Sequence, residues 1–296
     1  MTPSLSILIT AFREAETIGR AIEAFLAQLP EDAEIIVVCP DPETTAVVDR
    51  YAERTSVVRH VADPQRGKPT AVNAGLEAAT SQIVVLSDGD VIVDDEALEL
   101  LLAPFDDPQV GAVTGHPMSV NPRDTVLGYW SHLLTDAIHR MRLRRDRRGR
   151  FLLCSGYLFA FRRRLIDRVP EDALAEDAVI SHRIAQQDRR IRYAPDARVY
   201  VRYPLTYSDW LRQKVRSAGG YAQRYVTESP VRMRSPWLEL TTGAWMALGY
   251  PQDVREFLWT LLLFAARFHL WLLVLVKVRL LQRPLDTLWK RVESTK

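Results

Sequence analysis

The sequence predicts an α/β fold in which a mostly parallel, Rossmann-like sheet is flanked by helices and followed by an apolar helical region. Short apolar runs alternate with amphipathic stretches over the first half of the chain. This alternation is typical of βα units around a parallel sheet. Polar side chains follow the apolar runs, and a long segment with few charges lies near the carboxyl end. With 296 residues, 47% of them apolar, the chain can bury a large core, which excludes a disordered protein.

The apolar runs predict the strands, and the stretches between them predict the helices. Each run is short and aliphatic, whereas the intervening stretches place apolar residues at helical spacing. The predicted strands are 5–10, 34–39, 56–60, 83–87 and 111–115, and the predicted helices are 15–28, 44–53, 70–79 and 94–105.

Polar side chains stand where these strands end. Asp88 and Asp90 follow the run 83–87 directly. Carboxylate oxygens are the ligands that Mg²⁺ and Mn²⁺ prefer, and these cations bridge readily to phosphate, although Asp-Gly-Asp is also an ordinary turn sequence. In an open sheet the ligand lies beyond the carboxyl ends of the strands, so polar residues at these ends can share one crevice. The others are Arg13, Glu14, Asp41 and Lys68.

Charge and cysteine content narrow the class of protein. The formal net charge is only +2, yet one segment carries a cluster of arginines opposed by Asp146 alone. Cys39 and Cys154 are the only cysteines, which fits a reducing compartment and gives no zinc cluster. No basic leader precedes the first predicted strand, so we expect a cytoplasmic location. The clustered arginines are Arg140, Arg142, Arg144, Arg145, Arg147, Arg148 and Arg150.

Two segments suggest contact with a membrane. The segment 125–141 has apolar residues at helical spacing and leads into the arginine cluster. It is either a helix packed on the core with a solvated basic tail or a helix at an anionic membrane surface. The segment 257–276 approaches transmembrane length. Arg267 and the basic residues after it disfavour a simple span, so we expect an interfacial or re-entrant helix, with a buried helix or an oligomer interface as the alternative. The basic residues that follow are Lys277, Arg279, Arg283, Lys290 and Arg291.

A series of motifs runs in order through most of the chain. The segments are Ile7 to Ile18, Gly67 to Gly75, Ser87 to Asp90, Ser155 to Arg163, Ala175 to Asp177 and Gln213 to Ser217. Through them the chain resembles, from about Leu5 to Tyr221, the inverting glycosyltransferases of family 2, which include the catalytic domains of hyaluronan, chitin and cellulose synthases. The resemblance implies a GT-A catalytic domain over 1–230, with a nucleotide-binding half, 1–115, and an acceptor half, 116–230. The remainder, 231–296, would be a membrane-associating region.

The resemblance also implies a nucleotide and metal site. Asp90 would be the more direct ligand of Mg²⁺ or Mn²⁺, and Asp88 would contact the ribose or a metal-bound water. Lys68 would approach the base or the diphosphate. The first loop would border the base and ribose through Thr10, Ala11, Phe12 and Glu14.

On the acceptor side, the resemblance implies that Asp177 is the general base, with Glu176 beside it. An inverting transfer needs such a carboxylate, because the acceptor hydroxyl attacks opposite the leaving nucleotide and must lose its proton. Arg216, in the motif that begins at Gln213, would stabilise the leaving diphosphate.

Two departures from the family pattern limit these expectations. Relatives carry Asp-Asp-Gly-Ser after the second strand, whereas this chain has Cys39-Pro40-Asp41-Pro42. Asp41 is the natural substitute for the base-reading carboxylate, and UDP is favoured over GDP as the donor nucleotide. Ser217 replaces the tryptophan of the processive synthases, which argues against a channel that extrudes a polysaccharide.

We therefore expect a metal-dependent inverting hexosyltransferase of glycolipid biosynthesis. It would use a nucleotide diphosphate sugar and a lipid or lipid-linked acceptor at the cytoplasmic face of the membrane. The alternatives are a non-catalytic nucleotide-sugar-binding scaffold and a transferase with a soluble or polysaccharide acceptor. A nucleotidyltransferase is disfavoured because the first loop lacks glycine. Nucleic-acid binding is disfavoured because the arginine cluster lacks interleaved aromatic residues.

Overall fold

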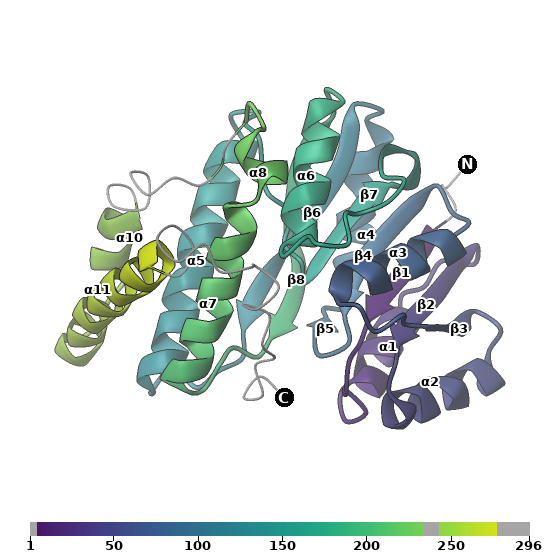
Figure 1. Cartoon of the computed structure of the whole chain (residues 1–296), viewed down its shortest axis with the longest axis horizontal. Coiled ribbons are helices and arrows are strands. Elements are labelled where there is room, and N and C mark those ends of the chain that lie inside the picture. The colour runs from purple at the N-terminus through teal and green to yellow at the C-terminus, as the bar shows by residue number, and fades with distance from the viewer. Residues whose placement is uncertain (1–4, 232, 234–242, 277–296) are drawn as a thin grey trace.

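The computed structural model describes residues 5–231, 233 and 243–276. These residues form one eight-stranded sheet, in the order β3-β2-β1-β4-β7-β6-β8-β5, with helices on both faces (Figure 1). Strands β1 to β4 pair in parallel, and β6 pairs in parallel with β8. Strand β7 runs antiparallel to both β4 and β6, and β5 runs antiparallel to β8. The sheet is therefore mixed, with its parallel half at the amino-terminal end of the chain.

The strands are β1 (Leu5–Thr10), β2 (Ala33–Cys39), β3 (Val58–Ala62), β4 (Ile83–Asp88), β5 (Ile92–Val93), β6 (Val110–Ser119), β7 (Leu158–Arg162) and β8 (Arg190–Val201). The α-helices are α1 (Ile18–Leu26), α2 (Pro42–Arg54), α3 (Lys68–Ala78), α4 (Ala97–Leu102), α5 (Val126–Asp146), α6 (Glu176–Gln186), α7 (Tyr207–Tyr221), α8 (Arg224–Thr227), α10 (Ala244–Leu248) and α11 (Val254–Val274). Short 3-10 turns follow α4 at Ala103–Asp106 and β7 at Arg163–Leu165.

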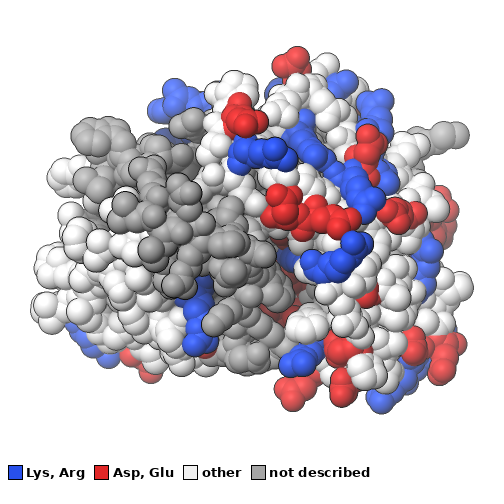
Figure 2. Space-filling view, in the orientation of Figure 1, with Lys and Arg blue, Asp and Glu red and all other residues white. Residues whose placement is uncertain are grey.

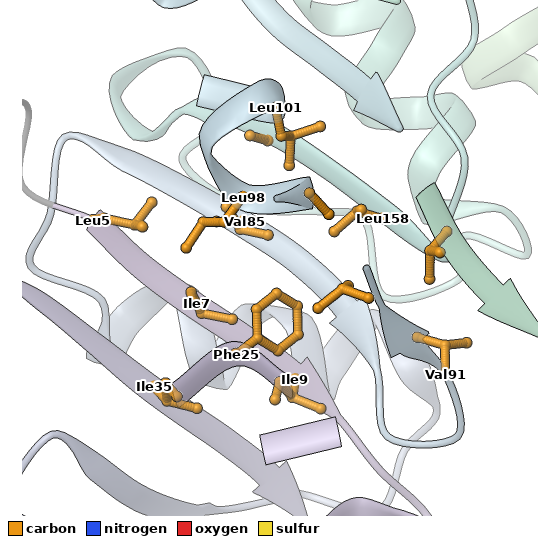
Figure 3. Packing of buried hydrophobic residues seen from close by; sticks show 14 of the residues in the cluster. Leu5, Ile7, Ile9, Phe25, Ile35, Val85, Val91, Leu98, Leu101 and Leu158 are labelled. Carbon is orange, nitrogen blue, oxygen red and sulfur yellow. The ribbon is translucent and has the colours of Figure 1, made fainter. Parts of the chain in front are cut away.

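Alternation along the central strands builds a core on each face of the sheet. Because successive strand side chains point to opposite faces, Ile7 and Ile9 pack on one side and Leu8 on the other. Figure 3 shows Phe25 of α1 against Ile7 and Ile9. These side chains are buried, so the central strands form a rigid platform whose carboxyl ends hold the polar loops.

Several predicted boundaries were wrong. The first helix begins at Ile18 rather than at residue 15, because the chain after β1 forms a loop in which Arg13 has a φ of 53°. The long helix α5 includes the first part of the basic tail and ends at Asp146, so Arg147, Arg148 and Arg150 lie beyond it. Leucine and arginine favour helices, and Asp146 anchors the end of α5 through Arg192 at 2.9 Å.

The carboxyl-terminal helices pack on α5 and α7 and form a third cluster, away from the parallel half of the sheet (Figure 1). Glu256 of α11 pairs with Arg123 at 2.7 Å, and the Thr260 hydroxyl lies 2.7 Å from that of Tyr129. Among the described residues, α11 is the helix long and apolar enough to cross a membrane, and 22% of its most apolar stretch is buried. The basic residues after position 276, which disfavoured a simple membrane span, lie outside the described residues.

Candidate functional site

The carboxyl ends of β1 and β4 meet at the centre of the candidate site. Thr10 and Asp88 are register partners, and the Thr10 hydroxyl donates to Asp88 Oδ1 at 3.3 Å. The amide of Gly89 donates to the Thr10 carbonyl at 3.0 Å. A Cβ at Gly89 would lie 2.6 Å from Glu14 Oε2 and 2.8 Å from Ala11 Cβ. Glycine therefore allows the Asp-Gly-Asp turn to lie against the first loop, as the predicted nucleotide site requires.

Lys68 connects this turn to α6. Its Nζ lies 2.6 Å from Asp88 Oδ1 and 2.8 Å from Glu176 Oε1. Burial acts to lower the pKa of Lys68, but the two carboxylates outweigh it and raise the pKa above the ordinary value. Burial likewise acts to raise the pKa of Glu176, but Lys68 and, more weakly, Arg216 hold it below the ordinary value. The two residues therefore form a charged pair between the end of β4 and the start of α6.

Asp177 lies in the first turn of α6, directly after Glu176. Its Oδ2 accepts from the Gly156 amide at 3.2 Å, and its Oδ1 accepts from the Ala178 amide at 2.8 Å. The Cys154 amide donates to Ser181 Oγ at 2.9 Å, which ties the segment before β7 to the same helix. The bonds from Gly156 and Ala178 orient the half-exposed Asp177 carboxylate, whose role as the base stays a prediction from the resemblance.

Tyr157 completes the site and was not among the predicted site residues. Its carbonyl accepts from Ser87 Oγ at 2.9 Å, because β7 begins at Leu158 beside the end of β4. Its ring meets that of Tyr203 edge to face, with 6.0 Å between centroids.

The electrostatic surroundings of Tyr157 show what it faces. Burial raises the pKa of its hydroxyl, and the charges of Asp90 and Asp88 raise it further. Arg216 acts in the opposite direction, and Asp177 contributes as well. Tyr157 therefore lies within range of the metal-motif carboxylates, the predicted base and the predicted arginine. Its position in the motif that runs from Ser155 to Arg163 was the sequence signal that could have located it.

Helix α7 supplies the remaining predicted residues. A Cβ at Gly220 would lie 2.7 Å from Ala175 Cβ, so the end of α7 abuts the start of α6. Arg216 lies about one turn earlier on α7 and is half-buried. Gln213 is also half-buried, and its Oε1 has no hydrogen-bond partner among the described residues. The structure thus brings the α7 motif to the α6 side of the site.

Asp41 is near the first loop, but its carboxylate is engaged by the protein. Oδ1 accepts from the Thr44 hydroxyl at 2.6 Å and from its amide at 3.0 Å, and Oδ2 accepts from the Arg13 amide at 2.7 Å. Burial acts to raise the pKa of Asp41, but these hydrogen bonds outweigh it and lower the pKa. Asp41 therefore caps α2 and holds the loop that leaves Phe12 exposed, and its contact with a base stays a prediction.

His182, on the same helix as Asp177, lies in the core. Only 2% of it is exposed, and its ring lies 4.8 Å from that of Phe151. Burial lowers its pKa to about 4. The aromatic residues Tyr207 and Trp210 stack on each other and contact Trp130, so they attach α7 to α5.

The residues present fit a divalent cation completed by a phosphate ligand. Asp88 and Asp90 supply hard oxygen atoms. The ion pair between Asp88 and the Lys68 ammonium shows that the Asp88 carboxylate pairs with positive charge. No group of three or more His, Cys, Asp or Glu side chains among the described residues could hold a metal ion. Mg²⁺ is commonly held by one or two carboxylates together with substrate phosphates, so a full protein cage is not required.

Known proteins of one family are similar to this chain in sequence. The model of the family described as glycosyltransferase like family 2 matches residues 3–220. Poly-beta-1,6-N-acetyl-D-glucosamine synthases from Staphylococcus aureus (strain COL) and Staphylococcus epidermidis are 27% and 26% identical to this chain over 223 residues. The match covers 73% of this chain but 54% of theirs, so the chain spans about half the length of these curated relatives.

A solved structure supports the fold. The mannosyltransferase PcManGT from Pyrobaculum calidifontis, in complex with GDP-Man and Mn²⁺, matches with a TM-score of 0.64 and 23% identity. The match covers 97% of this chain and 83% of that one. At this identity the likeness shows the fold alone, and it confirms the predicted GT-A-like α/β architecture.

Proposed function

Because the chain belongs to the family described as glycosyltransferase like family 2, we propose that it is a metal-dependent inverting glycosyltransferase working at a membrane surface. Membership of the family shows glycosyl transfer. The identity of the donor, the class of acceptor, the metal dependence and the roles of the site residues are proposed. One observation carries the proposal. The Lys68 ammonium contacts both Asp88 and Glu176, so the strand-end carboxylates lie beside the helix that begins with Glu176 and Asp177.

Asp177 is the proposed general base. The acceptor hydroxyl attacks the anomeric carbon opposite the leaving nucleotide, and Asp177 takes the proton that this oxygen loses. The hydrogen bond from the Gly156 amide holds the carboxylate in place without adding charge. A divalent cation at Asp90 and Asp88 would supply positive charge against the leaving diphosphate. Arg216 adds a guanidinium on the α7 side.

The donor is proposed to be a UDP-sugar rather than a GDP-sugar. The names of the curated relatives point to N-acetylglucosamine, whereas the name of the structural neighbour points to GDP-mannose. The curated relatives have the higher sequence identity, which favours the first. Asp41 is engaged by Thr44 and Arg13, so base selection would rely on backbone groups of the first loop.

The membrane part of the proposal rests on α10 and α11. One side of α11 packs on α5 and α7, and its other side exposes apolar residues, including Phe268 at 73%. Trp245 of α10 is 78% exposed, as an interfacial anchor would be. Figure 2 shows few charged side chains over the described part of this region. The exposed apolar residues of α11 are Val254, Phe257, Leu258, Leu261, Leu262, Phe268, Trp271 and Leu272.

The arginine cluster supports the same proposal. The carboxyl-terminal end of α5 borders an open pocket of about 410 Å³. A basic surface of this kind attracts anionic lipid head groups. Its lining residues are Arg140, Leu143, Arg144, Arg147 and Arg148.

Nucleotide release tests the transferase. The full chain is incubated with a panel of UDP- and GDP-sugars, Mn²⁺ or Mg²⁺, and either lipid extract or soluble saccharides. We expect release with one donor that requires metal and lipid and is lost in Asp177→Asn but kept in Asp172→Asn, an exposed aspartate outside the site. Release only with soluble saccharides would exclude the lipid acceptor. Donor binding without release under every condition would instead favour a non-catalytic scaffold.

Vesicle flotation tests the membrane surface. Leu258→Asp/Phe268→Asp places charges on the exposed side of α11, and we expect it to lower binding to anionic vesicles by at least about tenfold. Val120→Asp changes an exposed apolar residue far from α11 in sequence and serves as the matched control. Equal binding by both variants and the unmodified chain would remove α11 from the membrane contact.

A further inference from the structure

We infer that Lys68 is a resident cation of the donor site and that Glu176 is a positioning residue that holds Lys68 when a divalent cation takes its place at Asp88. The inference rests on the proposed metal site and assigns to Glu176 a role other than acid or base. The Lys68–Glu176 pair would then set how tightly the donor side binds the metal.

The contacts place one ammonium between two unequal carboxylates. Lys68 Nζ is 2.6 Å from Asp88 and 2.8 Å from Glu176, and both contacts are short, as charge-assisted hydrogen bonds are. The side chain of Asp88 is 21% exposed, whereas that of Glu176 is 9% exposed. A cation from solvent therefore reaches Asp88 more readily than Glu176.

The backbone lets the ammonium move while its helix stays in place. Lys68 is the first residue of α3 and follows Gly67, whose φ of 106° suits glycine. Asn73 anchors α3 by exchanging hydrogen bonds of 2.8 and 2.7 Å with the backbone of Val169. The lysine stem has several rotatable bonds, so its ammonium can leave Asp88 and stay on Glu176.

Charge gives the direction of the exchange. A divalent cation at Asp88 repels the ammonium, and Glu176 offers the ammonium a place to remain. An unpaired carboxylate in a buried position is unfavourable, so Glu176 retains Lys68. Thr10 donates to the same Asp88 oxygen through a neutral hydroxyl, which is not repelled in this way.

Two single substitutions should therefore change metal affinity in opposite directions. Lys68→Met removes the competing charge, and we expect Mn²⁺ to bind about tenfold more tightly. Glu176→Gln leaves the ammonium with Asp88 as its charged partner, and we expect Mn²⁺ to bind several-fold more weakly. Lys68→Arg keeps the charge and should stay closer to the unmodified chain than Lys68→Met does. A merely structural role for the pair would weaken binding in both single variants.

Calorimetric titration of Mn²⁺ into the full chain, with no donor or acceptor, measures this effect apart from glycosyl transfer. The double variant Lys68→Met/Glu176→Gln removes both buried charges and keeps the test usable if Lys68→Met does not fold; it should also bind Mn²⁺ more tightly than the unmodified chain. The inference is overturned if these lysine-free variants bind Mn²⁺ no more tightly, if Glu176→Gln binds it no more weakly, or if no variant binds it. If the pattern holds but transfer is absent, the proposed function fails alone.

Discussion

The loop after β2 and the turn after β4 both place an aspartate at one edge of the sheet, yet their partners differ in kind. Asp41 accepts hydrogen bonds from Thr44, which belongs to the helix that Asp41 caps, and from the backbone amide of Arg13 in the loop after β1. Asp88 accepts a longer hydrogen bond from the Thr10 hydroxyl, but its closest partner is the Lys68 ammonium, a charge on a flexible side chain. A carboxylate at a strand end therefore stabilises a loop when its partners are backbone and hydroxyl groups. It is suited to exchange ligands when its closest partner is a charged side chain.

The largest effect is expected at Asp177, which belongs to neither region. Asp177→Asn should lower the transfer rate by about 100-fold to 10,000-fold, because the acceptor hydroxyl loses its proton acceptor. Mn²⁺ affinity should change little, since the substitution leaves Asp88 and Asp90 intact. Steady-state rates and calorimetry on the same preparation check both expectations. A rate close to that of the unmodified chain would remove Asp177 as the base.

Paired substitutions at Asp41 and Asp88 sharpen the comparison. Asp41→Asn disturbs a buried hydrogen-bond network, so the free energy of unfolding should fall by about 1–3 kcal/mol, with Mn²⁺ affinity within about twofold. Asp88→Asn should weaken Mn²⁺ binding by at least about tenfold and change stability less.

Urea denaturation and Mn²⁺ titration of the two asparagine variants separate these effects. If Asp41→Asn weakened Mn²⁺ binding as much as Asp88→Asn, the two carboxylates would share one role and the contrast between the loops would be lost.

A smaller effect is expected in the pH dependence of stability. It comes from His182, which is buried on α6, the helix that also carries Asp177. The pKa of His182 falls from 6.5 to about 4 in the folded chain. The unfolded chain therefore binds more protons between these values, and stability is lost as the pH drops below 6.5. From pH 7 to pH 5 His182 should account for a loss of about 2 kcal/mol.

His182→Leu should remove this share of the pH dependence. Urea midpoints of the unmodified chain and of the variant, measured at pH 7 and pH 5, give the difference directly. The same loss of stability in both proteins would mean that His182 does not carry the effect.

The local sequence pattern predicted the carboxyl ends of the strands and the carboxylates there, because the residues of each strand and the turn after it determine them. The run 83–87 predicted β4 with an error of one residue, and Asp88 lies at its end. Helix ends were less accurate where capping and long-range pairs decide them. Asp41 caps α2, which begins two residues before the expected start, and Asp146 at the end of α5 pairs with Arg192.

The contacts between distant segments could not be read from the sequence. Lys68 meets Glu176 because α6 begins beside the end of β4, and Tyr157 enters the site because β7 runs antiparallel to that strand. Both depend on strand order, which hydrophobic periodicity does not encode. The resemblance to a family supplied residue roles but not the partner of each side chain.

The anomeric configuration of the product tests the central claim most directly. Transfer from the donor identified in the nucleotide-release panel is followed by NMR, and the anomeric coupling of the newly bonded sugar is compared with that in the donor. A single attack assisted by Asp177 predicts the opposite configuration in the product. Retention of the donor configuration would contradict a direct displacement and with it the role proposed for this carboxylate.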